Sequence, residues 1–465
     1  MDLVIKHNFF TTAKHSFHRQ HLLLLRLRTF AVLATTSGFA AFHLRNSYFY
    51  QDQWDGLHRA IHLRPIEAMA TSINGHLMIF DYWIHRIQIS AFGVDDHRFT
   101  IIIMLTTLLF INYVLVVLLR SIGVSGIAGL FIASFLTYLP TGAQDFLFVA
   151  QILPLAAVAL GLFSIVIVLR YEKSLAHGTV FGLSLFFSVL ADSGMATITF
   201  PAAAIFCAFC WSRKYLISLI PACILLVAWY LTADLSPHFD STLAQKCRFA
   251  FSLFFGSVGA IVGAGEIIGI VLTGIVVFIF VFGSTQNIFS KKTKIATAAF
   301  GASTLITTVA IAISRAGMPG FTLFEANRYI HNISIPFALT VLPFTFEFCA
   351  HQWQRFPHHT FAPLRQVLPV TLVALCFITS YPTFSKYSTQ FEENNVKVRG
   401  LVREAIQLIR QNCPDGKLLQ LDHRPIGNLS PQVSVQLLVD LMSIQALKGD
   451  PQVVPSQEII DAMCS

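Results

Sequence analysis

Long apolar runs alternate with short polar connections along most of the chain. Each run has about 20 residues or slightly fewer, and a helix of about that length crosses the hydrocarbon core of a bilayer. The runs are 22–42, 99–119, 122–139, 146–169, 175–191, 196–211, 215–231, 266–283, 295–313, 331–349 and 366–382. The pattern predicts an all-α polytopic membrane protein with about 11 transmembrane helices.

One further apolar stretch, 249–264, is short and interrupted by glycines. It predicts an interfacial or re-entrant piece that leads into the next span. The glycines of this region, like those at 123–129, are expected to allow close helix packing, because no Lys-Ser or Lys-Thr follows them as in a nucleotide-binding loop.

The chain contains two longer polar segments. The second of them, 383–465, is expected to form a carboxyl-terminal domain that follows a multi-spanning membrane domain, 1–382. Within the membrane domain, the first connection, 43–98, is a long loop with an amphipathic stretch from Leu77 to Phe92. Mixed apolar and charged positions there predict a helix along the membrane interface.

The tail has an ordinary soluble composition and is expected to form a small α/β or mostly α domain. Its pattern predicts helices at Phe391–Arg410 and Val433–Leu447, with a short strand at Leu418–Leu421 between them.

Composition agrees with the hydrophobic pattern and excludes other classes of protein. Hydrophobic residues make up 55% and charged residues 12% of the chain, and the mean hydropathy is +0.65. Soluble chains carry about twice that charge density. A soluble enzyme, a nucleic-acid-binding protein and a disordered chain are therefore excluded, in spite of the net charge of +8.

The distribution of Lys and Arg predicts the orientation. Short cytoplasmic loops are enriched in Lys and Arg, and Lys291, Lys292 and Lys294 form the clearest basic loop. We expect the amino terminus in the cytoplasm, the tail outside, and the protein in the cytoplasmic (inner) membrane. The same threading places most acidic residues outside, which predicts that polar chemistry occurs on that face.

The most informative stretch follows the first span. Asp52, Trp54 and Asp55 lie in the motif Tyr-Gln-Asp-Gln-Trp-Asp, and Asn74-Gly75-His76 follows in the same loop. A carboxylate at the membrane surface could act as a general base on an acceptor hydroxyl, and a Trp fits the headgroup region. The alternative is a solvated loop whose acids have no catalytic part.

This arrangement resembles the GT-C superfamily of membrane glycosyltransferases, which use polyprenyl-phosphate sugars on the extracytoplasmic face. The general layout is similar along the whole chain, but motif-level similarity is confined to about 43–98 and 314–330. The resemblance implies that Asp52 is the catalytic base, with Asp55 as the alternative. Many members have adjacent acids where this chain has Asp-Gln-Trp-Asp.

Further candidates belong to other predicted outer connections. Arg315 and Arg328, which is followed by Tyr329, could hold the donor phosphate, since the planar Arg fork matches phosphate oxygens; pairing with Glu325 or lipid headgroups is the alternative. Asp145 lies in a very short turn, so it must face the interface or a cavity, where it could contact the acceptor or a metal.

His76, with Asn74, could orient a substrate or touch the donor phosphate. Asp192 lies in a similar short turn and is a weaker candidate for the site.

Other ionisable residues have open interpretations. Asp81 and His85 are four residues apart on one helix face and could simply pair with each other. Glu266 could line an outer cavity, and Glu347 could reach the inner interface.

The sequence therefore predicts a glycosyltransferase whose partners are a polyprenyl-phosphate sugar donor, a glycan or lipid-linked acceptor, and the bilayer, but no nucleic acid. No cofactor is identified, although Asp52 and Asp55 could hold a divalent cation. The main alternative is a transporter or flippase for lipid-linked sugars; a polymerase of lipid-linked oligosaccharides and a non-catalytic scaffold fit less well.

Overall fold

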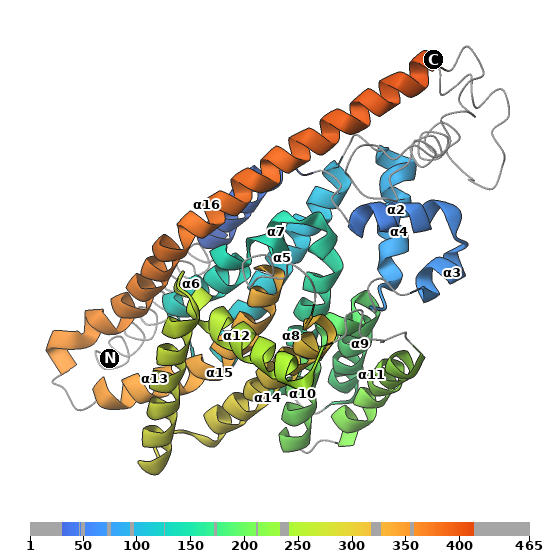
Figure 1. The fold of residues 1–465 in the computed structure, drawn as a ribbon. Coiled ribbons are helices and arrows are strands. Elements are labelled where there is room, and N and C mark those ends of the chain that lie inside the picture. Colours follow the sequence, from blue (N-terminus) through green and yellow to red (C-terminus); the bar gives the residue numbers. More distant parts are fainter. Residues whose placement is uncertain are drawn as a thin grey trace, which may run out of the picture.

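The computed structural model describes residues 30–45, 47, 52–71, 76–93, 97–124, 126–171, 174–210, 213–232, 241–317, 327–353 and 358–412. These residues form a bundle of helices, and no β-strand occurs among them (Figure 1). The all-α expectation is confirmed for this part of the chain. Asn74 and the tail beyond residue 412 lie outside the described residues, and so do the expected strand Leu418–Leu421 and helix Val433–Leu447 in that tail.

The first loop forms a small helical group beside the bundle (Figure 1). It consists of α2 (Asp52–His62), α3 (Pro65–Ala70), α4 (Ile79–Ile87) and the π-helical turn η1 (Gln88–Phe92). The expected amphipathic helix is present as α4 and η1. Helix α4 packs against both α2 and α9, so this group is attached to the bundle.

The bundle follows in chain order. Its helices and 3-10 turns are α5 (Arg98–Ser121), α6 (Gly126–Thr137), η2 (Pro140–Gly142), α7 (Ala143–Leu147), η3 (Val149–Gln151), α8 (Ile152–Arg170), α9 (Leu175–Ala191), α10 (Ser193–Cys210), α11 (Arg213–Thr232), α12 (Leu243–Ala260), α13 (Glu266–Thr285), α14 (Lys291–Arg315) and α15 (Asn327–Trp353).

Burial separates central from peripheral helices. The most apolar part of α8 is 78% buried, whereas the corresponding parts of α11 and α13 are only 11% buried. A helix that is apolar all round and largely uncovered by protein suits contact with lipid. Helix α8 therefore lies in the protein interior, and the exposed apolar surfaces of α11 and α13 are compatible with contact to a bilayer.

Seven of the described helices are long and apolar enough to cross a membrane. Four shorter apolar helices accompany them: Phe30–Leu44, Gly126–Gly142, Leu175–Ala191 and Ser193–Phe209. Together they match the eleven predicted runs one by one. The membrane class is supported, while eleven complete crossings remain a prediction, because four of the helices are short.

The stretch predicted at 249–264 belongs to helix α12, which begins earlier, at Leu243, and is followed by a turn into α13. Near its end, Ala260 accepts a hydrogen bond from the Thr141 hydroxyl at 3.0 Å. Nearer its middle, Leu253 packs against Tyr329. Thr141 and Tyr329 belong to predicted outer connections. An interfacial or re-entrant α12 should lie on that same side, so these contacts agree with the prediction.

Glycines bring α12 and α13 into close contact, as the sequence predicted. A Cβ added at Gly269 would overlap the backbone carbonyl of Phe255. The glycines between α5 and α6 have a different role, since Gly123 and Gly126 have φ angles of 102° and 75° and open space around them. They permit a left-handed turn rather than close packing.

Helix α16 (His358–Asn412) is a single helix of 55 residues that runs along one side of the bundle and past its end (Figure 1). It includes both the last predicted span and the predicted helix Phe391–Arg410, and it continues without a break through the expected boundary at 382–383. Pro382 lies inside this helix. Prolines are tolerated in membrane helices where other groups or local adjustments satisfy the freed backbone groups.

Candidate functional site

The first loop is fastened to the bundle by a histidine–aspartate pair. His76 Nδ1 lies 2.7 Å from Asp192 Oδ1, and the side chains are 27% and 2% exposed, respectively. Asp192 precedes α10, and its Oδ1 also accepts the backbone N–H of Met195 at 3.0 Å, as an N-capping residue does. The carboxylate is thus held by the start of a helix while it orients the imidazole.

Backbone contacts fix the same junction. The Leu77 N–H donates to Ser193 Oγ at 2.9 Å, and the Ser193 N–H donates to the Leu77 carbonyl at 3.2 Å. A Cβ at Gly194 would overlap the His76 ring. The Asp-Ser-Gly turn therefore provides a carboxylate, a hydroxyl and a gap that fits the imidazole.

This geometry has a chemical consequence for His76. An ionised Asp192 accepts a proton-bearing Nδ1, so in the neutral imidazole Nε2 keeps its lone pair. Among the described residues, none forms a hydrogen bond with Nε2, and the ring is partly exposed. Such an imidazole can accept a proton from a substrate or, when protonated, donate one to a phosphate oxygen.

A second cluster holds α2 against α4. His85 Nδ1 lies 3.2 Å from Asp81 Oδ1 and 2.9 Å from the Asp81 carbonyl, and Arg59 Nη2 lies 3.5 Å from Asp81 Oδ2. A Cβ at Gly56 would come within 2.7 Å of the His85 ring. The expected Asp81–His85 pair is present, and its burial between two helices indicates a structural role.

The acidic motif lies at the start of α2. Asp52, Trp54 and Asp55 belong to the first turn of this helix, although their side chains lie outside the described part of the structure. Residues three or four apart share a helix face. Asp52 therefore has the helical register of Gly56, and Asp55 has that of Arg59.

Asp145 lies inside the bundle rather than at an open surface. Its Oδ2 is 3.1 Å from His331 Nδ1, and the two side chains are only 3% and 2% exposed. The other ring nitrogen, His331 Nε2, lies 2.7 Å from the Leu136 carbonyl. Asp145 comes from α7 and His331 from the first turns of α15, so the pair joins the short turn at Asp145 to the start of the predicted span 331–349.

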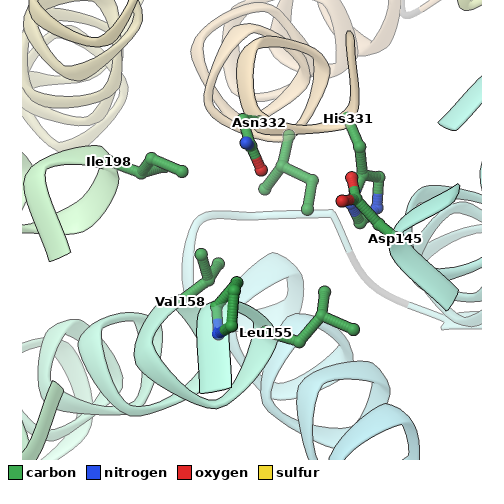
Figure 2. A pocket seen from close by; sticks show the side chains of 8 residues that line it. Asp145, Leu155, Val158, Ile198, His331 and Asn332 are labelled. Atoms are coloured by element: carbon green, nitrogen blue, oxygen red, sulfur yellow. The ribbon is translucent and has the colours of Figure 1, made fainter. Parts of the chain in front are cut away.

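A small cavity adjoins this pair. Asp145, His331 and Asn332 line it together with apolar side chains of α8, α10 and α15, and its volume is about 10 Å³ (Figure 2). That volume accommodates roughly one water molecule. A sugar does not fit this cavity in the conformation described.

Three further predicted site residues, Arg315, Arg328 and Tyr329, lie at the end of α14 and the start of α15. Arg315 is the last residue of α14 and is half-buried. Tyr329 is 7% exposed and packs with Leu253 and Ile333. Arg328 lies in the first turn of α15, but its side chain, like Asn74, lies outside the described part of the structure. Their contacts with a donor phosphate stay a prediction.

The two membrane glutamates have local partners. Glu347 Oε1 accepts the backbone N–H of Ser290 at 3.0 Å, beside the N-terminus of α14. Glu266, at the start of α13, accepts the Ser252 hydroxyl at 2.6 Å. Both contacts favour structural roles that connect neighbouring helices.

The sequence reasoning did not single out His331 or Asn332. A signal was present, since an ionisable residue at membrane depth is costly and often functional. Among the described residues, no group of three or more His, Cys, Asp or Glu side chains could hold a metal ion. A divalent cation at Asp52 and Asp55 is not tested by that finding.

Comparisons with known proteins do not assign this chain to a family. No protein-family model, curated protein or solved structure matches the chain.

Proposed function

We propose that this membrane protein is a glycosyltransferase that moves a sugar from a polyprenyl-phosphate donor to a cell-envelope glycan or lipid-linked acceptor on the extracytoplasmic face. The observation that carries the proposal is the attachment of the acidic first loop to the bundle through His76 and Asp192. A flexible, solvated loop has no need of such a junction, whereas a catalytic loop must be held in place.

The junction brings several candidate residues into one region. Helix α4 begins three residues after His76, and α2, with Asp52 and Asp55 in its first turn, packs on α4 (Figure 1). The acids and the oriented imidazole therefore belong to one unit at the side of the bundle.

In the proposed reaction, Asp52 or Asp55 removes the proton of an acceptor hydroxyl while its oxygen forms a bond to the anomeric carbon. The bond from that carbon to the lipid-phosphate oxygen breaks, and the phosphate leaves with the electron pair. A single displacement inverts the sugar carbon. Arg328, helped by Arg315, would stabilise the leaving phosphate, and His76 would orient the phosphate or the acceptor through Nε2.

The test uses the full-length protein in lipid nanodiscs with a panel of radiolabelled polyprenyl-phosphate sugars and membrane extracts as acceptors. Loss of a general base lowers turnover by about 10²–10⁴-fold. We expect that loss in one of the two variants Asp52→Asn and Asp55→Asn, with donor binding retained. Arg328→Ala is expected to weaken donor binding as well.

Glu67→Gln is the matched control. Glu67 is an acid of the same loop, but it is exposed and pairs with Arg64 on the surface. Its replacement should leave turnover unchanged. Full turnover in both Asp variants would refute the proposed base.

A transporter or flippase for lipid-linked sugars is the second candidate. The buried Asp145–His331 pair at the start of a membrane helix favours it, because such pairs also occur on ion and proton pathways. Saturable donor binding without turnover by the parent protein, combined with movement of labelled lipid across proteoliposomes, would favour the flippase.

A further inference from the structure

Two exposed histidines lie one turn apart on helix α2. His58 and His62 are both exposed, and their ring centroids are 4.4 Å apart, with an angle of 46° between the ring planes. Residues four apart share a helix face. This face differs from the one by which Gly56 and Arg59 meet α4, so the packing of the loop does not use these two rings.

The surroundings favour the neutral form of His58. Partial burial, the neighbouring His62 and the charge of Arg59 all lower the pKa of His58 below its usual 6.5. At neutral pH this imidazole therefore keeps a lone pair, and a neutral imidazole is the form that binds a metal ion. Two imidazolium groups at this distance would repel each other, whereas a shared cation joins two neutral rings.

The spacing of the rings suits one tetrahedral ion. A zinc–nitrogen bond is about 2.1 Å long, so the ring centroids of two histidines on one zinc ion lie about 5 Å apart. The rings of His58 and His62 are slightly closer than that, and small rotations about their side-chain bonds produce the required spacing. Two histidines four residues apart on one helix face are also the zinc-binding pair of many metalloproteases.

The cations nearest in the sequence are held by other groups. Arg59 Nη2 lies 3.5 Å from Asp81 Oδ2 on α4, and Arg64 pairs with Glu67. Their charges are therefore partly compensated beside the histidine pair. Each histidine needs only one ring nitrogen for the ion, and the other nitrogen can keep its own hydrogen bond, as is usual for metal-binding histidines.

We propose that His58 and His62 form a zinc site on the exposed face of α2, in which one nitrogen of each ring binds the ion. Water or an oxygen atom of a substrate fills the remaining positions, as in zinc sites that keep an open position for chemistry.

The zinc site needs only the two histidines and does not depend on the proposed sugar transfer. One consequence does rest on that proposed function. Asp55 has the helical register of His58, one turn earlier, so the ion belongs to the same helix as the candidate bases. A bound zinc ion there would offer positive charge to the phosphate oxygens of the donor.

Titration of the full-length protein in lipid nanodiscs with Zn²⁺ tests the pair. The protein carries a purification tag without histidine, is first treated with a chelator, and is followed by calorimetry. We expect one zinc site per chain, whose affinity falls by more than about tenfold in both His58→Gln and His62→Gln.

His351→Gln is the matched control, because it removes a partly exposed histidine near the end of α15. This variant should bind Zn²⁺ as the parent protein does. Undiminished binding in both variants of the pair would overturn the proposal.

Electron paramagnetic resonance with Cu²⁺ counts the ligands. Cu²⁺ binds a given imidazole site more tightly than Zn²⁺ does, and its spin-echo spectrum distinguishes one bound imidazole from two. We expect two bound imidazoles in the parent protein and at most one in each single variant. A single imidazole in the parent protein would overturn the shared site.

The outcomes separate this site from the proposed function. Zinc binding through both histidines, in a protein that transfers no sugar, would support the zinc site and refute the transferase. Sugar transfer by a protein that binds no zinc would overturn the zinc site alone.

Discussion

His85 is a buried imidazole on the first loop whose charge depends on one neighbouring carboxylate. Burial by itself lowers the pKa of His85, but the charge of Asp81 and the hydrogen bonds to it outweigh burial and raise the pKa above its usual 6.5. Protonation and folding of this loop are therefore linked.

Because the pKa of His85 is raised, the stability of the first loop depends on pH. A folded-state pKa above 6.5 stabilises the loop fully below that pH, and the stabilisation is lost as the pH rises through the raised value. We expect hydrogen exchange of α4, corrected for its intrinsic rate, to show less protection at alkaline pH.

Asp81→Asn should reverse this trend. Without the carboxylate, burial and the charge of Arg59 lower the pKa of His85. The loop would then lose stability as the pH falls instead. The same direction of pH dependence in both proteins would contradict the assignment to His85.

Asp192 has two separable roles, and a pair of substitutions distinguishes them. Asp192→Ala removes both the N-cap of α10 and the partner of His76, so we expect a loss of about 1–3 kcal/mol in stability. Asp192→Asn keeps an oxygen for the Met195 N–H and should cost less. Thermal unfolding measures the difference, and hydrogen exchange at 76–93 should rise in both variants. Equal unfolding temperatures in all three proteins would contradict the junction.

At the scale of elements, the contact between α12 and α13 depends on a glycine. A methyl group at Gly269 would overlap the Phe255 carbonyl, and the backbone cannot move aside as a flexible side chain can. We expect Gly269→Ala to lower stability by about 1–3 kcal/mol, measured by unfolding in mixed micelles.

Gly274→Ala provides the control on the same helix. A Cβ at Gly274 meets nothing within 4 Å, so this variant should be unchanged or slightly more stable, because Ala favours helix more than Gly does. Equal destabilisation by both substitutions would show that the contact at Gly269 is not the cause.

Helix α16 illustrates what local patterns predict well and poorly. Apolar content predicted its membrane segment, and amphipathic spacing predicted a helix at 391–410. Their fusion into one helix was not predicted, because the change from apolar to soluble composition after residue 382 was taken as the end of the span. The part of the helix beyond the predicted span is held by contacts with distant residues: Ser388 Oγ lies 3.0 Å from His43 Nδ1, and Arg399 donates to the Ser47 carbonyl at 3.3 Å.

At the scale of the whole molecule, contacts agree with the predicted alternation of sides. His76 meets Asp192, both expected outside, and Asp145, also expected outside, meets His331 at the first residue of the predicted span 331–349. Ser290 meets Glu347, and both were expected at the inner side. These contacts group the two ends of the bundle, and the basic loops predict which end faces the cytoplasm.

Cys247 offers a direct measurement of that orientation. It is exposed near the start of α12, on the predicted outer side. A membrane-impermeant thiol reagent should label it on intact cells, with the modified peptide identified by mass spectrometry. Gln286→Cys, at the far end of α13, should react only after the cells are opened. The reverse pattern would invert the threading.

The sequence by itself determined the membrane class, the apolar helices and the acidic first loop as a candidate region. These features depend on the composition of short segments, because burying apolar residues in lipid and closing backbone hydrogen bonds within a helix are local requirements. The positions of Asp52, Asp55 and His76 in one loop could likewise be read directly from the chain.

Only the tertiary structure decided which polar groups meet. His76 and Asp192 are 116 residues apart, and Asp145 finds His331 on a helix that begins much later in the chain. Each pair forms because packed helices bring two polar groups to one buried place, where neither is stable without a partner. No local pattern carries that information, since it depends on how all the helices pack together.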